Sequence, residues 1–195
     1  MKAQYPAKLA LQIAISICAK LGTACKQIEI AGSLRRRKRE VGDIEILYIS
    51  KMRTGELVDV DLFGTSERPA PRPLADIEIG RLESNGTLER RKNVKGNETF
   101  GERIKLMRHI ESGIPIDFFA CAPESWFNYL VCRTGGAESN TRIASLAKAR
   151  GYKWKPYTPG FIDLNDPDER TIAMENEEAV FRFVGLEYEE PWERP

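Results

Sequence analysis

Two acidic residues that alternate with apolar ones constrain this 195-residue chain more than any other feature. Asp43 and Glu45 alternate with Ile44 and Ile46, as in a strand with one acidic and one apolar face. The pattern predicts a strand over Asp43 to Ile49, with its apolar face against a core. The two acids repel each other, and a divalent metal ion is the usual counter-charge in a site built from oxygen atoms. A pair of surface acids on a half-exposed strand is the alternative.

A Gly-Ser turn precedes this strand and suits phosphate binding. Gly32 and Ser33 offer backbone amides and a hydroxyl, and Arg36 offers a planar guanidinium for phosphate oxygens. Each motif alone is common, but the turn and the acidic pair, ten residues apart, together indicate nucleotidyl transfer. The basic run from Arg35 to Arg39 binds phosphates in part, or else is a solvated loop or a sorting signal.

A third acid lies in a later apolar segment. Asp117 needs a partner among its apolar neighbours, unless it faces water at a sheet edge. On a strand beside Asp43 and Glu45 it would complete the ligands for two Mg²⁺ ions, or Mn²⁺ ions, that clamp the attacking and leaving oxygens. Short loops that contain glycine predict antiparallel hairpins between three strands, at residues 88–94, 100–108 and 114–120.

Composition favours an intracellular globular protein, cytoplasmic or nucleoid-associated, that is monomeric. The net charge is only +1, so affinity for nucleic acid must come from local basic clusters. The four cysteines have no Cys-x-x-Cys spacing and His109 is the only histidine, which favours reduced thiols over a disulfide framework or a zinc site. The apolar stretch from Leu9 to Leu21 is interrupted and too short for a bilayer, so we expect a buried helix and no membrane contact.

The remaining pattern divides the chain near residue 121. Proline and glycine within the segment from Arg53 to Pro73 predict a loop that is mobile when free. Helices are predicted at residues 6–21, 74–84, 124–131, 138–150 and 177–184. Further short strands are predicted at residues 28–30, 152–155, 161–164 and 171–173.

The motifs resemble those of a known family. Residues 30–36 and 42–46 resemble the Gly-Ser-x-x-Arg and Gly-Asp-x-Asp signature of family X DNA polymerases, the polymerase beta group. Residues 133–152 are similar to the thumb of that family, and residues 181–191 to its C-terminal end. The resemblance implies an α+β fold. Residues 1–121 would form a nucleotidyltransferase palm, with a mixed, mainly antiparallel sheet and helices on one face, and residues 122–195 a small α/β thumb.

The resemblance also implies roles for individual residues. Asp43, Glu45 and Asp117 would be the metal-binding and catalytic carboxylates, and Asp117 would also act as the general base toward the primer 3′-hydroxyl. Basic residues expected at nucleic acid are Arg35, Arg37, Lys38, Lys105, Arg142 and Lys148. Residues expected at the nucleotide are Gly32, Ser33, Arg36, Gly42, Cys132, Arg133, Gly135 and Asn140.

Several positions depart from the family pattern. Glu45 stands where the family usually has Asp, which makes the metal preference open. Cys132 and Arg133 occupy the Tyr-Phe positions that usually exclude a ribose 2′-hydroxyl, so NTP use stays open beside dNTP. Ala144 replaces an arginine that reaches the template strand. We also expect a minimal form that lacks the lyase and helix-hairpin-helix domains of longer relatives.

The expected function is metal-dependent nucleotidyl transfer to a nucleic-acid 3′-hydroxyl. The resemblance implies a minimal DNA-directed DNA polymerase that fills gaps in primer-template DNA during repair. A template-independent enzyme, or one acting on RNA or a small molecule, would share only the palm signature. A nucleic-acid-binding module without catalytic activity is the second alternative.

Overall fold

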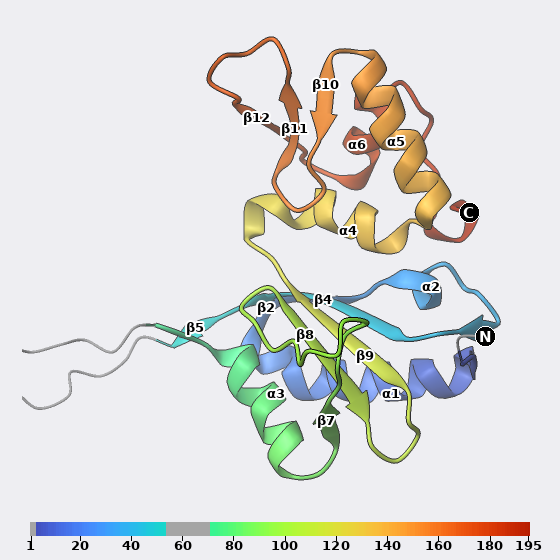
Figure 1. Cartoon of the computed structure of the whole chain (residues 1–195), viewed down its shortest axis with the longest axis vertical. Coiled ribbons are helices and arrows are strands. Elements are labelled where there is room, and N and C mark those ends of the chain that lie inside the picture. The colour runs from blue at the N-terminus through green and yellow to red at the C-terminus, as the bar shows by residue number, and fades with distance from the viewer. Residues whose placement is uncertain (1–2, 54–70) are drawn as a thin grey trace, which may run out of the picture.

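The structure is a computed structural model that describes residues 3–53 and 71–195. Figure 1 shows two lobes, which we call the palm (residues 3–53 and 71–121) and the thumb (residues 122–195). The palm is built on a twisted sheet, and the thumb lies over one face of that sheet. The predicted loop from Arg53 to Pro73 lies almost entirely outside the described residues. Its two described ends pair as short antiparallel strands.

The palm sheet is mixed, as the sequence predicted. Its strand order is β2-β4-β9-β8-β7, in which β4 and β9 run parallel and the other neighbours run antiparallel. The α+β class is confirmed. The palm elements are β1 (Tyr5–Pro6), α1 (Ala7–Leu21), η1 (Gly22–Ala24), β2 (Cys25–Ile30), α2 (Gly32–Arg35), β3 (Glu40–Val41), β4 (Ile44–Ser50), β5 (Met52–Arg53), β6 (Arg72–Pro73), α3 (Leu74–Ser84), β7 (Leu88–Arg90), β8 (Ile104–His109) and β9 (Pro115–Ala120).

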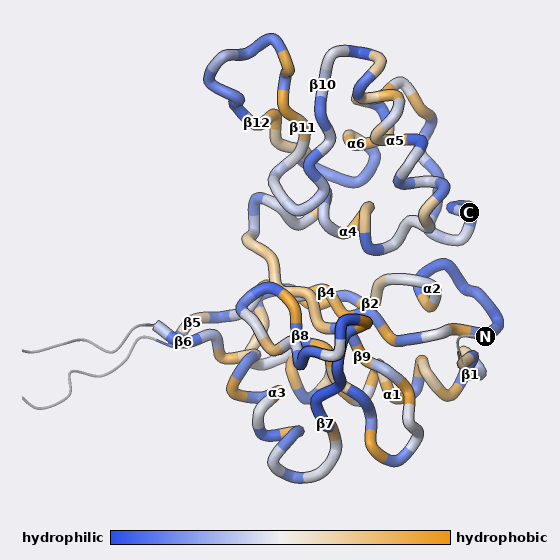
Figure 2. The backbone as a smooth tube through the Cα atoms, viewed as in Figure 1, coloured by the Kyte–Doolittle hydropathy of each residue, from blue (hydrophilic) through white to orange (hydrophobic). Residues whose placement is uncertain are grey.

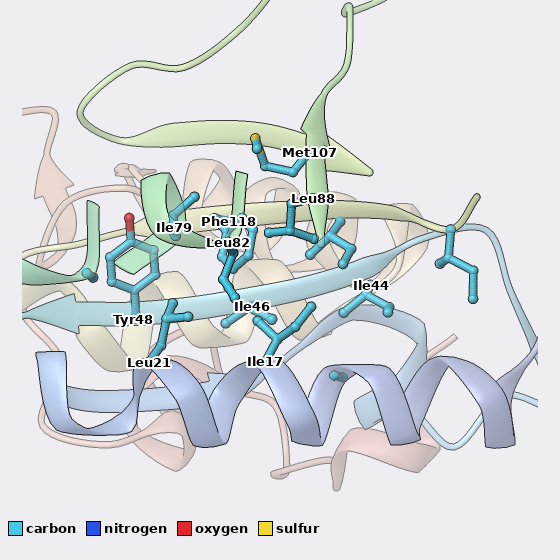
Figure 3. Packing of buried hydrophobic residues seen from close by; sticks show 14 of the residues in the cluster. Ile17, Leu21, Ile44, Ile46, Tyr48, Ile79, Leu82, Leu88, Met107 and Phe118 are labelled. Atoms are coloured by element: carbon cyan, nitrogen blue, oxygen red, sulfur yellow. The ribbon is translucent and has the colours of Figure 1, made fainter. Parts of the chain in front are cut away.

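Helices α1 and α3 cover one face of the sheet. Ile44, Ile46 and Tyr48 of β4 are fully buried against them, together with Ile17 and Leu21 of α1 (Figure 3). By length and composition the segment Ala7–Ala24 could cross a membrane, although only a third of it is buried. Its buried residues belong to the palm core, so the helix expected to be buried is buried along one side and exposed along the other.

The opposite face of the sheet is covered by α4 (Trp126–Thr134), the first long helix after the palm. Leu47 and Phe119 on this face pack with Trp126, Tyr129 and Leu130 of α4. The long palm helices α1 and α3 therefore lie on one face, while the thumb and the short helix α2 lie toward the other (Figure 1). The acidic side chain of Glu45 in β4 points toward this second face, because it alternates with the residues buried under α1.

The thumb has its own core and a small antiparallel sheet. Strands β10, β11 and β12 pair in that order, and α5 and α6 pack against them. Asn176 caps α6, with its side chain accepting the amide of Ala179 at 2.7 Å, directly before the helix predicted from residue 177. All four cysteines are free. The remaining elements are η2 (Pro123–Ser125), α5 (Ala137–Ala149), β10 (Tyr152–Trp154), β11 (Gly160–Asp163), β12 (Thr171–Ala173), α6 (Glu177–Phe183) and η3 (Pro191–Glu193).

Candidate active site between palm and thumb

The three predicted carboxylates gather where the palm sheet faces the thumb. Glu45 of β4 lies directly opposite Asp117 of β9 in the parallel register. Asp43 immediately precedes β4, which begins one residue later than predicted. Both Asp43 and Asp117 act electrostatically on Glu45, so the three acids form one cluster.

The electrostatic cost of the cluster is seen in the pKa of Glu45. Burial raises its pKa to about 7, Arg133 opposes that shift, and the charges of Asp43 and Asp117 add to it. Among residues 3–53 and 71–195, no group of three or more His, Cys, Asp or Glu residues is arranged to hold a metal ion as it stands. The donors still suit a cation, because three carboxylates supply oxygen ligands and the nearby arginines do not balance their charge. The metal-binding role of the three acids remains a prediction.

Two arginines partly neutralise the carboxylates. Arg91, which follows β7, makes a short ion pair with Asp117. Arg133, near the end of α4, places its Nη1 4.0 Å from Oε1 of Glu45. Asp117 is therefore paired with an arginine of the palm, and Glu45 with an arginine of the thumb. Arg91 was not among the residues predicted from the sequence to lie at the site.

A cavity of about 330 Å³ lies beside the acids, between α2 of the palm and α4 of the thumb. Of the predicted nucleotide-binding residues, Gly42 alone is not among the described residues that line it. Tyr157, which the sequence analysis missed, contributes to its wall. A larger cavity of about 540 Å³ lies at the other end of β4 and β9 and shares Tyr157 with the first. The smaller cavity is lined by Gly32, Ser33, Arg36, Asp43, Glu45, Cys132, Arg133, Gly135, Gly136, Asn140 and Tyr157.

The predicted phosphate turn forms the start of α2. Gly32 has a φ of +62°, and a Cβ at this position would lie 2.7 Å from Oε2 of Glu45. Glycine is therefore required both by the backbone and by the approach of Glu45. Arg36 donates to the backbone oxygen of Thr134 at 2.6 Å, and burial lowers its pKa. This arginine thus lines the cavity and also ties the palm to the thumb.

The thumb side of the cavity is built around the turn after α4. Asn140 donates to the backbone oxygen of Cys132 at 2.9 Å. A Cβ added to Gly135 would lie only 2.7 Å from Oδ1 of Asn140, so the turn packs closely against this amide. Burial raises the pKa of the Cys132 thiol. Contact of Asn140 with a nucleotide base stays a prediction.

The predicted nucleic-acid-binding residues differ in their surroundings. The hydrophilic segment after α2 is visible in Figure 2. Arg37 and Lys38 within it are exposed, as are Arg142 and Lys148 of α5. Arg37 also stacks over the ring of Trp192, with its Cζ 3.9 Å from the ring centroid.

Three members of that set form ion pairs. Arg142 binds Glu189 at the surface, and the other two are less exposed. Arg35 makes a bidentate ion pair with Glu177 of α6, at 2.6 and 2.9 Å. Lys105 is only 1% exposed, and its ammonium lies 2.9 Å from Asp76 and 3.3 Å from the hydroxyl of Tyr48. A lysine enclosed in this way has no surface to offer to a phosphate, which corrects the expectation for Lys105. Arg35 serves to join the lobes, a role that the sequence did not reveal.

Comparison with known proteins places this geometry in a structural class. Residues 129–195 match the family model described as the DNA polymerase beta thumb, so the second lobe is similar to a thumb domain of this type. No curated protein sequence matches the chain. Among solved structures, the chain is similar to that of Leishmania infantum polymerase beta in a ternary P/T complex. The TM-score is 0.72 at 17% identity, over 99% of this chain and 77% of that chain.

The chain thus has the polymerase beta fold, from the palm sheet through the thumb. Both findings support the resemblance to polymerase beta-like family X polymerases that the motifs suggested.

Proposed function

We propose that this protein is a DNA polymerase-type nucleotidyltransferase that extends a primer 3′-hydroxyl in gapped DNA, with Mg²⁺ or Mn²⁺ as cofactor. The observation that carries the proposal is the register of β4 and β9. It sets Asp117 beside Glu45, with Asp43 at the strand start, and Asp43 and Glu45 line a cavity whose other wall belongs to the thumb-like lobe. Three acids on adjoining strands, across from a phosphate-type turn, suit nucleotidyl transfer better than a structural role.

The residues around the cavity divide the work of binding. Ser33 and Arg36 stand at the start and just past the end of α2, where backbone amides and a guanidinium can hold a triphosphate. With the triphosphate held there, the sugar and base would lie against the thumb side, near Cys132 and Asn140. Asp117 would accept the proton of the primer hydroxyl, and its ion pair with Arg91 would keep its carboxylate oriented.

Divalent ions held by Asp43, Glu45 and Asp117 would supply charge neutralisation for the phosphoryl group in transfer. Catalysis by the protein itself would then consist mainly of positioning. DNA would be gripped through exposed basic residues such as Lys38 and Lys148, so its affinity should fall steeply as salt rises.

A primer-extension assay on gapped DNA tests the proposal, with dNTP or NTP and with Mg²⁺ or Mn²⁺. We expect incorporation directed by the template. Asp43→Asn and Asp117→Asn should each lower it by at least about a hundredfold, the scale on which one electrostatic stabiliser acts. Asp168→Asn, the same chemical change at an exposed thumb residue, is the matched control and should leave the rate unaltered.

The competing functions give different results in the same assay. Incorporation that ignores the template would favour a transferase of the RNA-end or template-independent kind. DNA binding without incorporation, under every combination of nucleotide and metal, would refute the enzymatic proposal and favour a nucleic-acid-binding module. The choice between dNTP and NTP follows from the relative rates.

A further inference from the structure

Arg133 is held more firmly than a surface arginine at the end of a helix. Its guanidinium carbon lies 3.8 Å from the ring centroid of Phe119 and 5.1 Å from that of Tyr157. Its Nη2 also donates to the hydroxyl of Tyr157 at 2.8 Å. Stacking and the hydrogen bond fix the plane and one end of the guanidinium fork. The cation therefore has a defined position in the wall of the cavity.

The other end of the fork faces Glu45 without bonding to it. Nη1 lies 4.0 Å from Oε1, which is an ion pair by charge but is too long for a hydrogen bond. Arg133 is thus able to offset the carboxylate charge while leaving the oxygen lone pairs available. In contrast, Arg91 binds Asp117 directly.

The length of Glu45 brings its carboxylate to this cation. Its Oε2 lies against Gly32, where any Cβ would be 2.7 Å away, and its Oε1 faces Arg133 on the other side. The glutamate therefore reaches from β4 across the space between α2 and α4. A fixed positive charge in this space attracts the acid but repels any second cation that approaches it.

We propose that Arg133 is a resident counter-cation of the carboxylate cluster, which lowers the affinity of the site for a divalent ion. The inference rests on the metal-dependent function proposed above. A unit charge and a divalent ion about 6 Å apart, screened as in water, repel enough to weaken binding on the order of tenfold. Arg133 would in this way reduce metal binding before a nucleotide brings its own negative charge.

Titration of the full chain with Mn²⁺ alone, without DNA or nucleotide, tests this inference. Electron paramagnetic resonance of free Mn²⁺ gives the dissociation constant. Arg133→Met should bind Mn²⁺ about tenfold more tightly than the wild type, because the charge is lost. Arg133→Lys keeps the charge and should stay within about twofold of the wild type.

Arg170→Met is the matched control, since it also removes a cation that is paired with a carboxylate, but on the exposed thumb surface. It changes the net charge equally and should leave Mn²⁺ affinity unaltered. If Arg133→Met does not fold by circular dichroism, Arg133→Gln removes the same charge and retains a donor for Tyr157. Its expected result is the same.

The outcomes distinguish a failure of the role inferred for Arg133 from a failure of the proposed function. Equal or weaker Mn²⁺ binding by the folded charge-removing variant would overturn the inference while leaving the proposed function intact, because a merely structural Arg133 predicts a loosened site. Absence of Mn²⁺ binding by the wild type would instead count against the proposed metal-dependent function itself. A second measurement is the rise in melting temperature on adding Mn²⁺, which should be larger for Arg133→Met than for the wild type.

Discussion

Two partly buried glutamates at the interface between palm and thumb have opposite electrostatics. Glu45 lines the cavity on the palm side, and Glu177 begins α6 on the thumb side. Both are removed from water and both lie near an arginine of the other lobe. Burial alone would raise the pKa of either one. The difference between them lies in how their arginines are placed.

Glu177 is satisfied by two arginines at hydrogen-bond distance. Arg35 of the palm binds both of its oxygens, and Arg194 near the C-terminus binds one of them at 2.8 Å. Burial raises the pKa of Glu177, but the hydrogen bonds and charge of Arg35, aided by Arg194, outweigh burial and lower it. Arg194 is fully buried and stacks over Phe181 and Tyr188. This group forms a clamp between the lobes.

Glu45 has Arg133 at 4.0 Å, a smaller charge contribution from Arg36, and two acids nearby. Its pKa rises to about 7, because burial and the neighbouring carboxylates outweigh Arg133. A glutamate is therefore stabilising at position 177, where its partners make hydrogen bonds, and destabilising at position 45, where they remain at a distance. An acid of the second kind is typical of a functional site, because it is retained at a cost to stability.

The largest expected effect follows from breaking the clamp. Glu177→Gln leaves the buried guanidinium of Arg194 without its carboxylate and removes the bidentate partner of Arg35. Breaking a buried ion pair on one side costs about 3–5 kcal/mol. Urea unfolding at neutral pH measures the loss. Glu178→Gln, one residue away in an exposed pair, should change stability by less than about 0.5 kcal/mol.

The pH dependence of stability should report the same clamp. The pKa of Glu177 is lowered in the folded state, below its value of about 4.5 in the unfolded chain. Between these two values the unfolded state binds more protons, so stability falls as the pH decreases through this window. Above the unfolded pKa the contribution is fully present. Unfolding free energies from pH 7 to pH 3 should fall more steeply for the wild type than for Glu177→Gln, and parallel curves would contradict this assignment.

The same substitution at Glu45 should act in the opposite direction. Glu45→Gln removes a buried charge that lies between two other carboxylates, so the metal-free protein should gain about 1 kcal/mol at pH 8. Urea unfolding in the presence of a chelator measures the gain. Primer extension should be lost at the same time. A destabilised Glu45→Gln variant would show that the ion pair with Arg133 outweighs the repulsion from the neighbouring acids.

The carboxylate cluster could be predicted from the sequence, because a period of two places Asp43 and Glu45 on one side of a strand. The five longer helices and most strands were also predicted within a few residues, since caps and hydrophobic periodicity are local signals, whereas the short helix α2 was expected to be a turn. Asn176 illustrates this, because its capping role depends only on the three residues that follow.

The partners of the acids could not be predicted, because they depend on how distant segments meet. Arg35 and Glu177 are separated by 142 positions, and Arg91 and Asp117 by 26. Arg35 was expected at nucleic acid, and Arg91 was assigned no role. Nothing in a local pattern distinguishes a solvated arginine from one that binds a buried acid. Lys105 was misplaced for the same reason, since its partners Asp76 and Tyr48 come from α3 and β4.

The smallest effect is expected at the outer edge of the clamp. Arg37 is exposed. It contacts the thumb by stacking over Trp192, which is itself 45% exposed. Exposed contacts of this kind are worth about 0.5–1 kcal/mol. Arg37→Ala should therefore lower the unfolding free energy by that amount, several times less than Glu177→Gln. Lys38→Ala removes the same charge from the next residue and should have an effect within about 0.5 kcal/mol of zero. Equal losses at Arg37 and Lys38 would mean that general charge, and not the contact with Trp192, determines stability at this edge.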